Sequence, residues 1–328
     1  MHLDSNNTAD LEAYLKAQNW LAADETLRSA TKPGEGNMNY ALRVQTSTGR
    51  SFIVKQARAY VEKYPSIAAP TERAIIEGHF YRKIQHHDQL RAFMPQLVGT
   101  DSQNSVLAVE DLGQANDYTY LYQPNQRIDD SDLVGLARFA SQLHLTFAGN
   151  PDAIFANRAM RALNHEHIFN YPFRNDSGFD LDTVQAGLQS VALPYQTDAV
   201  LSKAAHALGQ VYLQDGRHLL HGDFYFGSFL KTTAGVKIID PEFCFYGPAE
   251  FDLGVLIAHL KMARQSDKSI QVLKTNYESP DGFDEKLLDQ FTGVEIMRRL
   301  IGLAQLPLSL SLTEKQQLLV HARELVVG

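Results

Sequence analysis

The hydrophobic pattern of this 328-residue chain changes its period at Gly113. In the segment 39–57, apolar residues alternate with polar ones on both sides of the turn sequence TSTGR, which predicts a β-hairpin. The segment 105–113 predicts a further strand that ends at Gly113. Beyond it, the segments 131–148 and 197–213 place apolar residues at helical spacing. A β-rich part therefore precedes a helix-rich part, and this length suggests two lobes.

Each part contains one exception to its pattern. Ile76, Phe80 and Ile84 have helical spacing, which predicts one helix within the β-rich part. In the helix-rich part, the segments 229–231 and 236–239 predict a short hairpin around the turn sequence TTAG. Because this hairpin follows the sequence HGDFYFGS and precedes the sequence DPE, we expect it to bring several polar side chains within reach of each other. These side chains are Asp223, Ser228, Asp240 and Glu242.

Composition excludes several classes of function. The formal net charge of −8 gives no general footprint for binding nucleic acid. The single cysteine, Cys244, excludes an internal disulfide and a thiolate zinc site. The N-terminal sequence lacks the pattern of a signal peptide, and no run of about 18 apolar residues predicts a membrane span. We therefore expect a folded cytoplasmic protein with neither a nucleic-acid partner nor a membrane partner.

Asp223 lies in the aromatic sequence LLHGDFYFGSFL, where an ionised carboxylate costs several kcal/mol unless it is paired or used. Phosphoryl transfer uses such a carboxylate to orient the attacking hydroxyl group, and it also needs oxygen ligands for Mg²⁺ and a cation for the phosphates. In the kinase pattern, a second Asp follows a short hairpin and a strand Lys pairs with a helix Glu. Asp240, Lys55 and Glu77 stand at these places.

Four stretches carry a resemblance to a known family: HGDFYFGS, IDPEFCFYGPAEFDLG, IVKQA and MRRLIGLA. Together they identify the chain as similar to the aminoglycoside phosphotransferase and choline kinase superfamily, and within it most closely to the 5-methylthioribose kinase family. Two features depart from the latter family. Tyr225 and Phe226 replace its His-Thr pair, and the only tryptophan, Trp20, is not in a substrate loop. The resemblance therefore implies the reaction type and leaves the acceptor open.

The resemblance implies an α+β fold of the two-lobed protein-kinase-like type. A small β-rich nucleotide-binding lobe would comprise residues 1–112, and a larger helical lobe for catalysis and substrate binding would comprise residues 113–328. The implied cofactors are ATP and Mg²⁺, and the implied partner is a small molecule with a hydroxyl group. The implied catalytic residues are Asp223, Arg298 and Arg299. The implied nucleotide-binding residues are Lys55, Glu77, Gly36, Asn37, and Glu110 and Leu112 of the hinge. The implied metal-side residues are Ser228, Asp240 and Glu242.

Several polar residues have structural interpretations. We expect His221 to hold the backbone of its loop, Asp252 to brace the same loop by hydrogen bonds, and His144 to be a satisfied core histidine. Without the resemblance, Arg298 and Arg299 would be interpreted as a solvated helix face.

Two functions from different classes remain open at this stage. The first is an active small-molecule kinase, and the second is a nucleotide-binding pseudokinase with a regulatory role. The presence of Asp223, Asp240 and Glu242 favours the enzyme, because a pseudokinase is expected to lose such carboxylates. The acceptor is not specified, although the segment 164–173 is a candidate lining of its pocket. The oligomeric state is also open, with a homodimer as one alternative.

Overall fold

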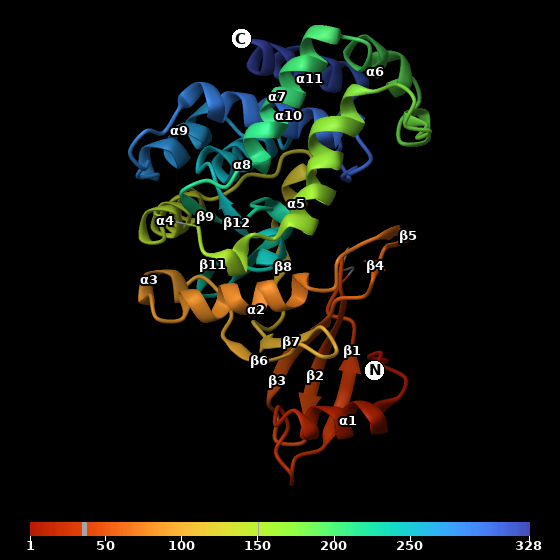
Figure 1. Cartoon of the computed structure of the whole chain (residues 1–328), viewed down its shortest axis with the longest axis vertical. Coiled ribbons are helices and arrows are strands. Elements are labelled where there is room, and N and C mark those ends of the chain that lie inside the picture. Colours follow the sequence, from red (N-terminus) through yellow and green to blue (C-terminus); the bar gives the residue numbers. More distant parts are fainter. Residues whose placement is uncertain (35–37, 150) are drawn as a thin grey trace. The chain divides into compact units, whose positions relative to one another are not determined.

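A computed structural model describes residues 1–34, 38–149 and 151–328 (Figure 1). The chain divides into two compact units. The N-terminal unit comprises residues 1–115 together with 237–244, and the C-terminal unit comprises residues 116–236 and 245–328. A short segment from the middle of the helix-rich part thus belongs to the N-terminal unit, a return of the chain that the sequence pattern does not indicate.

The N-terminal unit is built on a five-stranded antiparallel sheet with the strand order β1-β2-β3-β7-β6. Its strands are β1 (Leu27–Thr31), β2 (Tyr40–Thr46), β3 (Ser51–Gln56), β6 (Leu97–Asp101) and β7 (Val106–Glu110). A separate hairpin consists of β4 (Tyr60–Val61) and β5 (Tyr64–Ala68). The helices are α1 (Thr8–Ala17), α2 (Arg73–Ile84) and α3 (Asp88–Arg91). The predicted hairpin and the predicted helix of the β-rich part are confirmed as β2–β3 and α2.

Alternation of buried side chains explains why β2 and β3 stay in register. Leu42 and Val44 of β2 and Phe52 and Val54 of β3 are all buried, and they share one hydrophobic cluster with residues of α1. A slip of one residue would move this whole set to the opposite face of the sheet. The register therefore fixes Lys55 beside Leu107 of β7.

Helix α2 packs on β6 and β7 of the same unit. Gly78 makes this approach close, because a Cβ atom at that position would lie 2.4 Å from Cγ2 of Thr100. Any larger residue would force the helix away from the sheet. Glu77, the neighbour of Gly78 in α2, is fully buried as a result of this packing.

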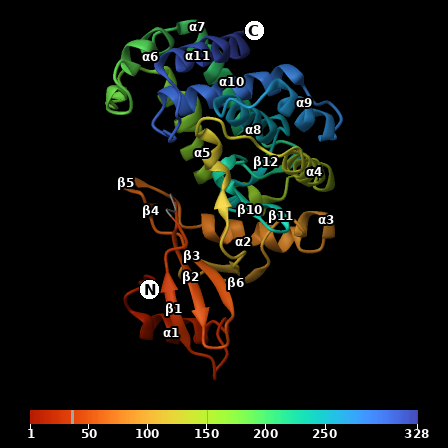
Figure 2. The same ribbon diagram turned by 180° about the vertical axis from the view of Figure 1, so that it is seen from behind.

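The C-terminal unit is mainly helical, as Figure 2 shows from behind. Its helices are α4 (Asp130–Thr146), α5 (Arg158–His165), α6 (Leu188–Gln196), α7 (Ala199–Leu213), α8 (Glu250–Met262), α9 (Asp267–Asn276), α10 (Glu285–Ile301) and α11 (Leu312–Val327). Its strands are β8 (Asn116–Asp117), β9 (His218–Leu220), β10 (Phe229–Thr232) and β12 (Phe245–Gly247), while β11 (Gly235–Ile238) leads into the N-terminal unit. The predicted hairpin of the helix-rich part is confirmed as β10–β11.

Single turns of other helix types connect these elements. The 3₁₀ turns are η1 (Tyr118–Tyr122), η2 (Ala153–Phe155), η4 (Tyr171–Phe173), η5 (Leu181–Thr183), η6 (Phe226–Ser228) and η7 (Pro241–Phe243). The segment η3 (Glu166–Asn170) is a π-helix that continues α5.

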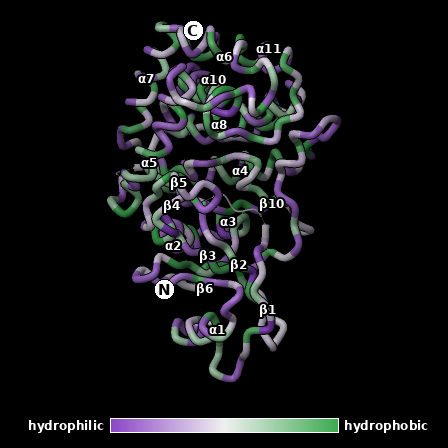
Figure 3. Tube along the Cα trace, turned by 90° about the vertical axis from the view of Figure 1, so that its right-hand side faces the viewer, coloured by the Kyte–Doolittle hydropathy of each residue, from purple (hydrophilic) through white to green (hydrophobic). Residues whose placement is uncertain are grey.

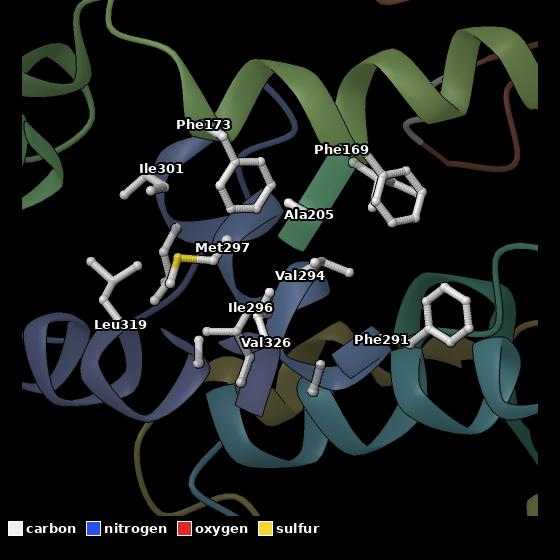
Figure 4. Packing of buried hydrophobic residues seen from close by; sticks show 14 of the residues in the cluster. Phe169, Phe173, Ala205, Phe291, Val294, Ile296, Met297, Ile301, Leu319 and Val326 are labelled. Carbon is white, nitrogen blue, oxygen red and sulfur yellow. The ribbon is translucent and has the colours of Figure 1, made fainter. Parts of the chain in front are cut away.

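Helix α10 forms the centre of a large apolar cluster of the C-terminal unit (Figure 4). Phe291, Met297 and Ile301 of α10 belong to this cluster together with Phe169 from η3 and Leu319 from α11. Burying each such side chain contributes roughly 1.5–3 kcal/mol. The fixed position of α10 matters because the same helix carries Arg298 and Arg299.

Helix α8 is buried along nearly its whole length, and Figure 3 shows hydrophobic and hydrophilic residues intermixed in the region of this helix. It is a core helix with 13 residues. In the part of the chain that the structure describes, no helix combines the length and hydrophobicity needed to cross a membrane.

Candidate active site

Lys55 lies within β3, and its side chain is buried. Nζ donates a hydrogen bond to Oε1 of Glu77 at 2.8 Å and also contacts a carboxylate oxygen of Asp240. The strand, helix α2 and the returning segment 237–244 thus each supply one member of a charged cluster. The predicted pairing of Lys55 with Glu77 is confirmed.

Burial and charge oppose each other in this cluster. Burial alone would lower the pKa of Lys55, but the negative charges of Asp240 and Glu77 outweigh it and raise this pKa well above its ordinary value. Burial raises the pKa of the Glu77 carboxyl group, against the opposing effect of Lys55. One cation therefore faces two carboxylates, which leaves an excess of negative charge.

Asp240 has a left-handed backbone conformation, with φ 62° and ψ 51°. Such a conformation costs a residue other than glycine about 1–3 kcal/mol and is often found at functional sites. The Asp240 side chain is 42% exposed, whereas that of Glu77 is fully buried. The strained residue therefore presents a carboxylate that solvent and ligands can reach.

Glu242 follows Asp240 in η7 and is buried. Nδ2 of Asn39 donates a hydrogen bond to its Oε2 at 2.9 Å, and Nε of Arg73 lies 3.4 Å from the same atom. Burial raises the pKa of the Glu242 carboxyl group to about 8, although Arg73 opposes the rise. Glu242, interpreted from the sequence as a second metal ligand, thus has two protein partners in this structure.

Arg73 is a fully buried cation that sequence reasoning missed. Its guanidinium donates hydrogen bonds to the carbonyl oxygens of Met38, Arg58 and Pro70, and to Oδ1 of Asn39. The start of α2 is thereby tied to the segments around residues 38 and 58. No sequence signal marks this role, because most of the acceptors are backbone carbonyl groups.

The end of β7 is held by the side chain of Asp111. Arg43 donates to this carboxylate at 2.9 Å, the Ser51 hydroxyl at 2.5 Å and the backbone N–H of Gly113 at 3.0 Å. Burial would raise the pKa of Asp111, but the hydrogen bonds from Ser51 and Arg43 lower it. Asp111 therefore remains ionised and fixes the path of the predicted hinge.

Glu110 is hydrogen-bonded to Gln96 through both its backbone and its side chain. Its backbone N–H donates to the carbonyl oxygen of Gln96 at 2.8 Å, and its Oε2 accepts from the backbone N–H of Gln96 at 3.0 Å. Contacts of Glu110 and Leu112 with an adenine ring stay a prediction. Gly36 and Asn37, the other predicted nucleotide-binding residues, lie outside the described residues.

In the C-terminal unit, the loop after β9 carries Asp223. Gly222 has a φ of +83°, a left-handed conformation that glycine adopts without steric cost. Asp252 accepts hydrogen bonds from the backbone N–H groups of His221 at 2.7 Å and Gly222 at 2.9 Å. The Ser228 hydroxyl donates to the carbonyl oxygen of Asp223 at 2.8 Å. The predicted bracing role of Asp252 is confirmed, and Ser228 holds the loop from its other side.

His144 supports Asp252 from the core of the unit. The ring is fully buried, with Nδ1 2.8 Å from the Tyr277 hydroxyl and Nε2 3.3 Å from Oδ2 of Asp252. The expectation that His144 is a satisfied core histidine is confirmed.

The Asp223 side chain is 20% exposed and lies 3.7 Å from NH2 of Arg299. Burial raises the pKa of its carboxyl group, and the nearby charges of Arg299 and Arg298 oppose this rise. Phe224 and Phe226 of the aromatic sequence around Asp223 are fully buried in the core.

Tyr225 differs from its two aromatic neighbours. The guanidinium of Arg299 lies 4.9 Å from the centre of the Tyr225 ring. This ring therefore supports the arginine by a cation–π contact.

Arg298 and Arg299 are buried, so they do not form a solvated helix face. Both bind the buried carboxylate of Glu295, which lies one helical turn earlier in α10. Nε of Arg299 donates to Oε1 at 2.6 Å, and NH1 of Arg298 donates to Oε2 at 3.1 Å. Burial would raise the pKa of Glu295, but the two arginines lower it far below its ordinary value. Sequence reasoning missed Glu295, although the spacing E-x-x-R-R indicates the contacts.

The segment 164–173, the predicted acceptor lining, contacts this arginine pair. Oδ1 of Asn164 accepts a hydrogen bond from NH2 of Arg298 at 3.1 Å. His167 lies in the π-helix η3, and burial together with Arg298 lowers its pKa to about 4. Because π-helical turns are frequent at functional sites, this segment stays the best candidate for acceptor contacts.

Within residues 1–34, 38–149 and 151–328, no group of three or more His, Cys, Asp and Glu side chains is arranged to hold a metal ion. Mg²⁺ in phosphoryl-transfer sites needs only one or two carboxylates, because water and phosphate oxygens complete its coordination. The exposed carboxylate of Asp240 fits this requirement. Ser228 and Glu242, the other predicted metal residues, are engaged with protein groups.

The N-terminal unit combines a sheet and a helix with the cluster of Lys55, Glu77 and Asp240. The helical C-terminal unit carries Asp223 in a loop braced by hydrogen bonds. Together these features define the class of kinase-like phosphotransferase folds. Residues 29–287 match the phosphotransferase enzyme family known as APH. The chain belongs to this family, and the predicted superfamily and fold class are confirmed.

Individual relatives agree with this assignment. The chain is 30% identical over 270 residues to methylthioribose kinase of Klebsiella pneumoniae. This alignment covers 76% of this chain and 64% of that enzyme. The chain is 27% identical over 334 residues to methylthioribose kinase of Exiguobacterium sibiricum, covering 84% and 80%. The crystal structure of LicA in complex with AMP shares the fold, with a TM-score of 0.57, 12% identity, and coverage of 98% of this chain and 100% of that one.

Proposed function

We propose that this protein transfers the γ-phosphoryl group of ATP to a hydroxyl group of a small, sugar-like molecule. The observation that carries the proposal is Lys55 held between Glu77 and Asp240, with Asp240 also accessible. The names of the relatives support it, because two are methylthioribose kinases and one solved structure contains AMP. ATP as the donor implies a reaction in the cytoplasm.

The N-terminal unit would bind the nucleotide. Lys55 would bind the phosphate oxygens, with Glu77 orienting its ammonium group, and the hinge at Glu110 and Leu112 would meet the adenine ring. Asp240 would hold Mg²⁺, which when bound neutralises charge on the phosphates. This unit contains the predicted nucleotide-binding lobe, residues 1–112, and adds the segment 237–244 that carries Asp240.

The C-terminal unit would handle the acceptor. Asp223 would accept a hydrogen bond from the acceptor hydroxyl group and orient its oxygen for attack, and later take its proton. Arg299 and Arg298 would stabilise the negative charge of the phosphoryl group. Because the charges of Arg298 and Arg299 are balanced by the carboxylates of Glu295 and Asp223, this cluster favours a neutral acceptor.

A panel of alcohols incubated with ATP and Mg²⁺ tests this proposal by release of ADP. It should contain 5-methylthioribose, unmodified neutral pentoses and the cationic alcohol choline. We expect turnover with a neutral sugar and none with choline. Nucleotide binding without turnover on any acceptor would instead support the pseudokinase, and turnover only with choline would contradict the acceptor class.

A further inference from the structure

Glu295 binds more charged and polar partners than a helix-surface glutamate requires. Its side chain is 1% exposed, and its two oxygens accept from Arg299 Nε at 2.6 Å, Arg298 NH1 at 3.1 Å and His259 Nε2 at 3.0 Å. A buried carboxylate is costly unless such bonds satisfy it. These contacts are made although Glu295 is not among the residues proposed to touch nucleotide or acceptor.

His259 holds the Glu295 carboxylate from helix α8. Burial lowers the pKa of His259 to about 4, so the ring is neutral and has one N–H group. A carboxylate can only accept, which places that hydrogen on Nε2. Nδ1 must then accept from the Tyr122 hydroxyl, 2.6 Å away. Glu295 is therefore fixed through two further elements of the C-terminal unit.

Arg299 lies between the carboxylates of Glu295 and Asp223 and is closer to that of Glu295. Its Nε is 2.6 Å from Oε1 of Glu295, the length of a strong charge-assisted hydrogen bond. Its NH2 is 3.7 Å from Oδ1 of Asp223, which is beyond hydrogen-bond distance. The guanidinium is thus bound to Glu295 and acts on Asp223 only by its charge.

We propose that Glu295 is a positioning residue that competes with Asp223 for Arg299 and so keeps the Asp223 carboxylate open for the acceptor hydroxyl group. Without the charge of Glu295, Arg299 would close on Asp223 and form a hydrogen-bonded ion pair with it. The oxygen needed by the acceptor would then be occupied. This inference rests on the proposed function, but its structural part can be tested without activity.

A double-mutant cycle on the melting temperature tests the competition in the purified protein. Asp223→Asn should lower Tm more in the Glu295→Gln background than in the wild type, by about 2 °C or more, because the Asp223–Arg299 pair has become tight there. The matched control is Glu250→Gln, which alters a buried glutamate that binds the backbone N–H of Asp284. With that control the two effects should add.

Additive effects of Glu295→Gln and Asp223→Asn would overturn the proposal. If Glu295→Gln does not fold, the variant Glu295→Gln/Arg298→Gln removes one cation together with one anion and is expected to show the same coupling. Additivity in that background would likewise overturn it.

Kinetics give the second arm. Glu295→Gln should lower kcat by about tenfold to a hundredfold, the range expected for misplacing a reacting group, with the KM for ATP unchanged. Glu295→Asp keeps the charge on a side chain one methylene shorter and should recover part of kcat. Equal losses in both variants would contradict competition for Arg299. An inactive wild type would refute the proposed function, and the melting-temperature cycle would still decide the role of Glu295.

Discussion

The two units differ in how they balance charge around their candidate site residues. In the N-terminal unit one ammonium group faces two carboxylates, whereas in the C-terminal unit two guanidinium groups face two carboxylates. These groups are Lys55, Glu77 and Asp240 in the first unit, and Arg298, Arg299, Glu295 and Asp223 in the second. The first cluster has an excess of negative charge that suits a metal cation, and the second is balanced and suits a neutral acceptor.

The two aspartates differ in the same sense. Asp240 is 42% exposed and has a strained backbone, while Asp223 is 20% exposed and lies in a loop braced by hydrogen bonds. An exposed carboxylate can exchange its protein contacts for a metal ion. A carboxylate in a braced loop is suited to orient the hydroxyl group of the acceptor. This difference predicts separable effects of mutation in the two units.

The largest effect is expected for Asp223→Asn, which keeps the volume of the side chain and removes its charge. Turnover on the true acceptor should fall by roughly 10²-fold or more, the range for loss of a general base. Binding of ATP with Mg²⁺, measured by calorimetry, should not change, because its proposed ligands lie in the other unit. Wild-type turnover in this variant would make Asp223 a structural loop residue.

Asp240→Asn should affect ATP binding as well as turnover, unlike Asp223→Asn. Removal of the proposed metal ligand should weaken Mg²⁺-dependent binding of ATP by about tenfold or more and reduce turnover as well. Calorimetry with Mg²⁺ and with a chelator separates the metal contribution from the nucleotide contribution. Equal loss of affinity under both conditions would argue against a metal at Asp240.

A smaller, severalfold loss of ATP affinity is expected for Lys55→Met, which keeps the length of the side chain without its charge. Some affinity should persist through the proposed hinge contacts of the adenine ring. Titration of wild type and variant with ATP and with adenosine provides the control, since adenosine lacks phosphates and should bind both equally. An unchanged ATP affinity would show that Lys55 is only a partner of Glu77.

The smallest effect concerns acid stability of the C-terminal unit. His259 and His167 both have pKa values lowered by burial to about 4, from an ordinary value of 6.5. Between these values the unfolded chain binds protons that the folded chain does not, so stability should fall as pH drops from 6.5 to about 4. His167→Gln should reduce the slope of Tm against pH in this window. Parallel curves for wild type and variant would contradict the shift at His167.

Local patterns predicted the elements that support the site. Alternation predicted β2 and β3, helical spacing predicted α2, and the turn sequence predicted β10 and β11. The motifs of the family resemblance predicted the Lys55–Glu77 pair and the bracing by Asp252, which the structure confirms.

The parts that sequence did not predict depend on contacts between distant segments. Arg73 and Glu242 are far apart in the chain, and the burial that makes their pairing important exists only in the folded unit. Glu295 is different, because its arginine partners lie three and four residues away on the same helix. The sequence pattern E-x-x-R-R indicates these contacts, but the sequence does not show that this face of α10 is buried.

The composition of the N-terminal unit from residues 1–115 and 237–244 has a consequence for biosynthesis. A ribosome that has released the first 115 residues has made the five-stranded sheet and α2 but not Asp240. The cluster of Lys55 and Glu77 is therefore completed only after Asp240 has been synthesised. Separate domains usually fold in order from the N-terminus, but the proposed nucleotide site depends on this later segment. A nascent or truncated chain that ends before residue 237 lacks Asp240 and so has an incomplete ion cluster, and it should bind ATP with Mg²⁺ more weakly than the full chain.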